Sequence, residues 1–71
     1  MQAPVKNLSP REREIVTRLA NGDHQKAIAA DLGISTRTVE VFISRARLKV
    51  RAKTTIQLVF ICCGFPLRDS A

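Results

Sequence analysis

The chain has 71 residues, enough for one small domain, and its twelve Lys and Arg against six Asp and Glu give a net charge of +6. The proportions of apolar residues (45%) and charged residues (25%) are those of a folded protein and exclude a disordered basic tail. The positive charge favours a polyanionic partner such as nucleic acid, because neutralised phosphates release condensed counterions.

The cysteines and the chain ends exclude several other classes of protein. Cys62 and Cys63 are adjacent, so they cannot join distant segments or supply spaced pairs of metal ligands. We expect reduced thiols, a cytoplasmic protein and no cofactor or metal. Residues 1–7 lack the apolar segment of a signal peptide, and the apolar run near the C-terminus, about ten residues long, is too short to cross a bilayer. No catalytic set of His, Cys and carboxylate stands out, so we predict no enzymatic activity.

The first helix is predicted to begin at Ser9. The Ser9 hydroxyl can accept from the free amides of the first turn, Pro10 suits the first helical position, and Glu12 can reach back to the Ser9 amide. Apolar residues then recur at helical spacing, and Gly22 ends the helix because glycine tolerates a left-handed conformation.

Two further helices follow, joined by a tight turn. Asp23 is the predicted cap of a short second helix that runs through Leu32 and ends at Gly33. Ser35 is the predicted cap of a third helix that runs to about Val50. Two helices joined by a short turn with a glycine form a helix-turn-helix unit, which binds DNA through its second helix.

A fourth helix is predicted near the C-terminus. Thr54 and Gln57 have the spacing of a capping box, and Gly64 and Pro66 terminate the helix after about Cys63. The predicted fold class is therefore all-α, a four-helix helix-turn-helix domain over residues 8–67, with a lead-in at 1–7 and a tail at 68–71.

The third helix has one apolar face and one mixed face when its residues are placed about 100° apart. The apolar face consists of Val39, Phe42, Ile43, Ala46 and Val50. The opposite face consists of Arg37, Glu40, Val41, Ser44, Arg47 and Arg51, with Arg45 and Lys49 on the flank. Arginine can pair with guanine, glutamate can accept from cytosine, and valine can contact a thymine methyl group. This face therefore favours DNA reading over an ordinary solvated surface.

Several ordered motifs together resemble the DNA-binding domain of LuxR-type regulators. They are Leu8–Val16 with Gly22, Lys26 with Ile28-Ala29, Leu32–Ser35 with Thr38–Val41, Lys49-Val50, and Gln57–Val59. The resemblance covers about residues 8–63. It implies a four-helix domain whose third helix enters the major groove and whose fourth helix forms a two-fold dimer contact.

The candidate DNA-binding residues come from this resemblance and from helix geometry. The resemblance implies base contacts by Glu40, Val41 and Ser44, and phosphate contacts by Lys26, Arg37 and Thr38. Charge and helix geometry add Arg45 and Arg47, and Thr36 at the start of the helix completes the set.

The sequence also departs from the usual family pattern. Ala27 stands where a glutamate is usual, and Phe42 stands where a histidine is usual. Many members have lysine at the position of Glu40, so the preferred DNA sequence cannot be transferred from a relative. Only seven residues precede the first motif, so we expect no sensor domain. Met1 and the apolar ending favour a complete chain, and the alternative is an excised domain.

A second resemblance leaves an alternative open. Ser44–Arg47, with Lys49 and Arg51, is similar to the last domain of extracytoplasmic-type sigma factors, which reads a promoter element. The capped helix from Thr54 favours the LuxR-type interpretation, and a sigma factor needs a separate promoter-melting domain.

The fourth helix is apolar on every side except at Gln57. A helix of this kind is usually buried on more than one side, and a chain this short has little protein to cover it. We therefore predict a symmetric dimer through Ile56, Val59, Phe60 and Cys63, extended by Phe65 and Leu67. The alternatives are complete burial of the helix within its own chain and, for the cysteines, a redox role in place of simple packing.

Two functions of different classes remain. The first is sequence-specific binding of double-stranded DNA as a homodimer that regulates transcription, with half-sites roughly 10 bp apart and contact with RNA polymerase or a larger regulator. The second is an antagonist that heterodimerises with a larger LuxR-type regulator.

Overall fold

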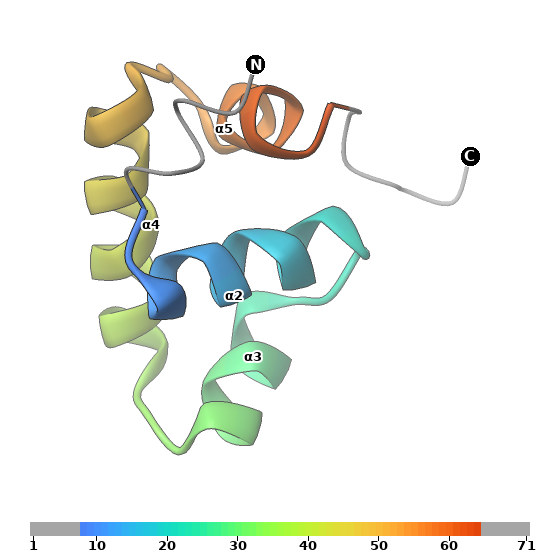
Figure 1. Cartoon of the computed structure of the whole chain (residues 1–71). Coiled ribbons are helices and arrows are strands. Elements are labelled where there is room, and N and C mark those ends of the chain that lie inside the picture. Colours follow the sequence, from blue (N-terminus) through green and yellow to red (C-terminus); the bar gives the residue numbers. More distant parts are fainter. Residues whose placement is uncertain (1–7, 65–71) are drawn as a thin grey trace.

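The computed structural model describes residues 8–64, which form four helices and no strand (Figure 1). The helices are α2 (Pro10–Ala20), α3 (Gln25–Leu32), α4 (Thr36–Val50) and α5 (Thr55–Cys63). The predicted all-α, four-helix fold is confirmed. The expectations for the lead-in, for Phe65 and Leu67 and for the tail fall outside the described residues.

The predicted capping box at the start of α2 is present. The Ser9 Oγ accepts from the Glu12 amide at 3.2 Å, and the Ser9 amide donates to the Glu12 Oε1 at 2.9 Å. Two of the free amides at this helix end are thereby satisfied. The helix ends at Ala20, and Gly22 has a φ of 94° in the turn that follows.

The starts of α4 and α5 are also capped as predicted. The Ser35 Oγ accepts from the Thr38 amide, and the Thr54 Oγ1 accepts from the Gln57 amide, each at 3.0 Å. The capping box predicted here is incomplete, because the Gln57 Oε1 accepts from the Lys53 amide at 2.6 Å and not from the Thr54 amide. The Gln57 side chain therefore holds the residue before the cap.

The predicted cap of α3 is wrong. The residue at the N-cap is His24, which makes no side-chain capping bond, and the helix begins at Gln25. The Asp23 carboxylate instead accepts from Arg18, whose Nη2 also donates to Asp31 Oδ2 at 2.7 Å. The arginine therefore joins α2, the following turn and α3, and this ion pair replaces the cap.

The core lies where α2 packs against the other three helices (Figure 1). α2 contacts α3, α4 and α5, and α4 contacts both α3 and α5. The buried apolar side chains are Leu8, Ile15, Val16, Leu19, Ala20, Ile28, Ala29, Val39, Ile43, Ala46, Ala52, Leu58 and Val59. All four helices contribute, together with Leu8 and Ala52 from the segments beside them, so α4 packs through its inner face against the rest of the domain.

An ion pair between a buried carboxylate and an exposed lysine joins the start of α2 to the end of α4. Glu12 is 2% exposed, and its Oε1 accepts from the Lys49 Nζ at 2.8 Å. Burial of the carboxyl opposes its ionisation, but the hydrogen bonds from Lys49 and from the Ser9 amide outweigh burial, so the pKa of Glu12 is lowered. The charged form of Glu12 is therefore part of the folded structure.

The Glu12–Lys49 pair should make the stability of the domain depend on pH. We expect Lys49→Met to lower the free energy of unfolding by about 1–2 kcal/mol at neutral pH, because it leaves a buried carboxylate without its cation. Since the pKa of folded Glu12 is lowered, its contribution is complete above the ordinary glutamate pKa and is lost as the pH falls through the lowered value. Urea unfolding across the acid range measures both effects.

Lys53→Met is the matched control, because Lys53 is exposed and has no ion pair within residues 8–64. It should leave both the stability and its acid dependence nearly unchanged. Equal effects of the two substitutions would contradict the role given to Glu12.

Candidate nucleic-acid interface

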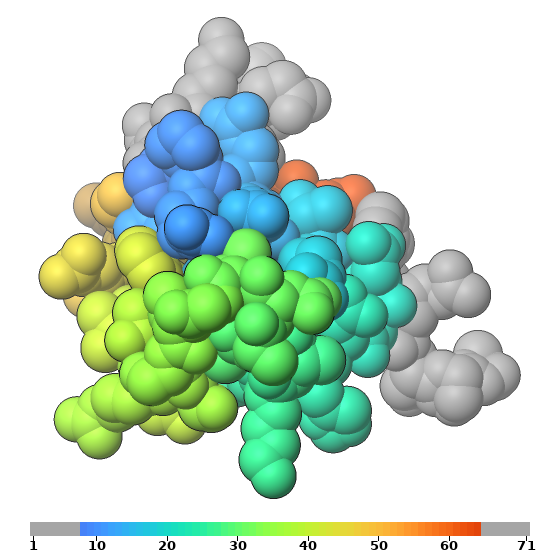
Figure 2. All heavy atoms as spheres, turned by 90° about the horizontal axis from the view of Figure 1, so that it is seen from below, coloured from blue at the N-terminus to red at the C-terminus, as the bar shows by residue number. Residues whose placement is uncertain are grey.

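The connection between α3 and α4 is a tight turn that fixes the angle between these helices. Gly33 caps α3 with a φ of 71°, and the Ile34 amide donates back to the Ala29 carbonyl at 3.0 Å. Ile34 is half-buried against the core, and Ser35 then caps α4. The predicted helix-turn-helix unit is therefore formed. In Figure 2, the green atoms of α3, the turn and the start of α4 form one continuous face at the front of the molecule.

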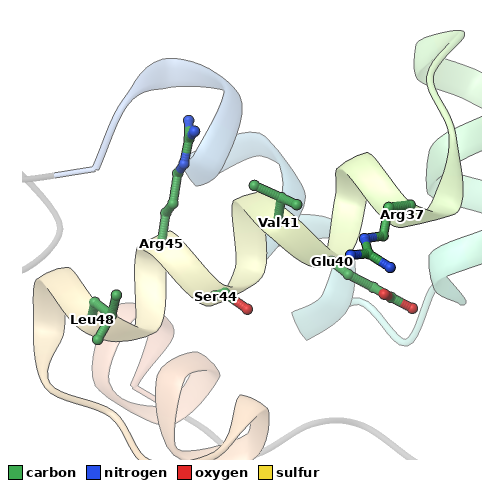
Figure 3. A pocket seen from close by; sticks show the side chains of 6 residues that line it. All are labelled: Arg37, Glu40, Val41, Ser44, Arg45 and Leu48. Carbon is green, nitrogen blue, oxygen red and sulfur yellow. The ribbon is translucent and has the colours of Figure 1, made fainter.

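The outer face of α4 carries an open groove lined by residues of that helix alone (Figure 3). Its lining consists of Arg37, Glu40, Val41, Ser44, Arg45 and Leu48. All six side chains are exposed, whereas Val39, Ile43 and Ala46 on the opposite face are buried. The amphipathic division predicted for this helix is therefore present, and we call this outer surface the α4 face.

The α4 face combines the three kinds of group that read base edges. Arg37 supplies donors, Glu40 supplies acceptors, and the Ser44 hydroxyl supplies both. Val41 and Leu48 add apolar surface that can contact thymine methyl groups. A helix with such a face fits the width of the major groove, which is about 12 Å.

Five of the predicted DNA-binding residues come together on this face. They are Arg37, Glu40, Val41, Ser44 and Arg45. Three others lie elsewhere in the helix-turn-helix unit: Lys26 is exposed in the first turn of α3, and Thr36 and Thr38 are half-buried in the first turn of α4. The Thr38 Oγ1 shares a hydrogen bond of 2.9 Å with the Ser35 Oγ, so it supports the cap of α4.

Arg47 does not lie on the α4 face. Its Nη2 donates to the Lys53 carbonyl at 2.8 Å, and its Nε is buried without a hydrogen-bond partner in the described part of the chain. The side chain therefore braces the connection between α4 and α5, and its contact with DNA stays a prediction. A helical wheel places a residue around an axis but does not show where a long side chain folds.

Leu48 is a member of the α4 face that the sequence reasoning did not select. It is 80% exposed, and it lies seven residues after Val41, so both residues are on the same side of the helix. That spacing was the available signal, but an isolated leucine in a sequence is more readily assigned to the core.

The exposed side of α5 is a second candidate surface. Ile56 is 58% exposed and Phe60 is 56% exposed, and one more turn along the helix Cys63 is half-buried. Val59, which the prediction also placed in a dimer interface, is 0% exposed and packs in the core of its own chain. The structure corrects this assignment, because Val59 points about 100° away from Phe60 around the helix. We call Ile56, Phe60 and Cys63 the α5 face.

The two cysteines are free thiols at the edge of the core. Burial raises the pKa of both the Cys62 and the Cys63 thiols, which keeps them in their less reactive protonated form. Within residues 8–64 no group of three His, Cys, Asp or Glu side chains has the geometry to hold a metal ion. No helix in the described part of the chain has the length and apolar character needed to span a membrane.

Known proteins are similar in sequence to this chain over most of its length. A family model described as bacterial regulatory proteins of the luxR family matches residues 6–62. The transcriptional regulatory protein FixJ of Azorhizobium caulinodans is 46% identical over 55 residues, which are 78% of this chain and 26% of that protein. FixJ of Rhizobium meliloti is 41% identical over 59 residues, which are 83% of this chain and 29% of that protein.

A more distant relative covers nearly the whole chain. The probable HTH-type transcriptional regulator GfsR of Streptomyces halstedii is 33% identical over 69 residues, which are 97% of this chain and 28% of that protein. The chain thus spans little more than a quarter of these relatives. No solved structure matches it significantly. The family match extends from before α2 to within one residue of the end of α5, and the chain belongs to the luxR family of bacterial regulatory proteins.

Proposed function

We propose that this chain binds specific sequences of double-stranded DNA as a dimer, with α4 in the major groove, and so regulates transcription. The observation that carries the proposal is the α4 face, where side chains of three kinds that can read base edges are exposed. The opposite face of the same helix is buried in the core. The relatives are named as transcriptional regulators, which agrees with this role.

The arrangement of charge supports DNA binding over other uses of the α4 face. Arg37 and Arg45 are exposed and have no acidic partner within the described residues, so they are available for phosphates or bases. Lys26 is exposed on α3, the helix that precedes the reading helix. In helix-turn-helix proteins this first helix crosses the DNA backbone, where a lysine meets phosphate.

The α5 face supports dimerisation. Ile56, Phe60 and Cys63 have the spacing i, i+4, i+7, so they form one stripe along the helix. A two-fold axis across this stripe buries the same apolar side chains on both copies. Two reading helices then face DNA in the same direction, and a site with two-fold symmetry matches them.

Selection of bound duplexes from a random DNA pool tests the proposed function. We expect an enriched motif with two-fold symmetry and discrimination of roughly a thousandfold or more over unrelated duplexes. Weak binding without a motif, lost as the salt concentration rises, would instead leave a protein antagonist as the function, with a larger regulator bound through the α5 face.

Substitutions on the α4 face should change which DNA is preferred. We expect Glu40→Ala and Val41→Ala each to lose about 1–3 kcal/mol of discrimination between the selected motif and single-base variants, because each removes one base-edge contact. Binding titrations against a panel of such variants measure the loss. Glu14→Ala, which removes an exposed glutamate from α2, is the matched control and should leave the preference unchanged. Unchanged discrimination in the two α4 variants would exclude this helix as the reader.

Substitution on the α5 face should separate dimerisation from DNA reading. We expect Phe60→Glu to weaken self-association and the cooperative occupation of two half-sites, because it places a charge in an apolar contact. Gln57→Glu adds the same charge to an exposed polar position of the same helix and should have little effect. Analytical ultracentrifugation and titration on one-half-site and two-half-site duplexes measure both. Equal cooperativity in parent and Phe60→Glu would rule out the α5 face as the interface.

A further inference from the structure

Arg51, at the end of α4, has a backbone conformation that ordinarily requires glycine. Its φ is 61° and its ψ is 38°, and it is the only residue other than glycine with a positive φ in the described part of the chain. The corresponding caps of α3 and α5 are Gly33 and Gly64. A Cβ atom in this conformation lies too close to the following carbonyl oxygen. The chain therefore accepts strain at Arg51 that it avoids at the two comparable positions.

The turn around Arg51 is held firmly by its neighbours. The Ala52 amide donates to the Arg47 carbonyl at 2.8 Å, and Ala52 itself is buried. The Lys53 amide donates to the Gln57 side chain at 2.6 Å, and the Lys53 carbonyl accepts from the Arg47 side chain at 2.8 Å. The exposed side chains of Arg51 and Lys53 therefore extend from a fixed backbone on either side of a buried residue.

Neither of these two cations has a structural partner. Among residues 8–64, no acidic side chain forms an ion pair with Arg51 or Lys53. The negative end of the α4 dipole favours a cation in the last turn, but Arg47 and Lys49 already supply two there. Neither an ion pair nor the helix dipole therefore accounts for an arginine at a position where glycine has less strain.

Arg51 directly follows the last residue of α4, its position continues the row of the α4 face, and its side chain is exposed. It follows Ser44 by seven residues and Leu48 by three, and both of these line the groove. A separation of seven residues corresponds to about 10 Å along the helix axis. The major groove is about 12 Å wide, so a side chain this far beyond the base-reading residues meets the sugar-phosphate wall of the groove.

We propose that Arg51, together with Lys53, binds a phosphate group of the DNA backbone beside the bases that α4 reads. This inference rests on the proposed function for the placement of α4 in the groove. A planar guanidinium binds phosphate oxygens in a bidentate manner, and the fixed turn reduces the entropy lost on binding. The backbone strain at Arg51 is then retained because its side chain contacts the ligand.

The test is Arg51→Gly, because the inference predicts opposite effects on stability and on DNA binding. Glycine relieves the strain, so the unfolding midpoint should be unchanged or higher. Affinity for the selected duplex should fall about three- to tenfold, and the slope of log affinity against log salt should become shallower by about 0.9 for each copy bound. Thermal unfolding and titrations at several salt concentrations measure these quantities. Arg51→Lys keeps the charge and should keep the salt slope.

A second duplex separates this inference from the proposed function. Phosphate contacts do not depend on base sequence, so Arg51→Gly should also make the salt slope shallower on a random-sequence duplex. A chain that shows this change but selects no motif would refute sequence-specific binding and leave the phosphate contact standing. If Arg51→Gly keeps the parent affinity and salt slope on both duplexes, or if the parent binds neither, the phosphate contact is excluded.

Discussion

The position of α4 depends on one buried carboxylate, that of Glu12. It caps α2 through the Ser9 amide and accepts from the Lys49 Nζ, so the start of α2 and the end of α4 share one charged group. Removal of Lys49 leaves the buried Glu12 carboxylate without its cation, which makes this contact a constraint on how the two helices pack. At its other end, α4 is fixed by the glycine turn from α3. The outer face therefore stays free while both ends are held.

Ion pairs inside the domain also decide which cations remain available for a ligand. Arg18 is held by Asp23 and Asp31, and Lys49 is held by Glu12, all away from the groove on α4. By contrast, Arg37, Arg45 and Arg51 have no acidic partner in the described structure. Unpaired arginines thus follow the outer side of α4, where they can attract a polyanion.

The sequence predicted helix starts well where a cap has a single strong local partner, as at Ser9, Ser35 and Thr54. It failed at Asp23, because an arginine from the preceding helix competes for the carboxylate. The apolar pattern of α5 has no polar face to fix its rotation, so Val59 was assigned to the surface. Arg47 was assigned from helix geometry, which does not include the Lys53 carbonyl that its side chain reaches. Each case concerns a contact between elements.

The turn after α4 fixes the orientation of the α5 face relative to the α4 face. Ala52 is anchored in the core, and the backbone of Lys53 is hydrogen-bonded at both its amide and its carbonyl. The direction of α5 relative to α4 is therefore set by the fold and not by a loose linker. In the proposed dimer, the distance between the two reading helices follows from this turn and from the contact at Phe60. In that dimer, the turn that contains Arg51 determines both the spacing of the two half-sites and the contact with the DNA phosphates.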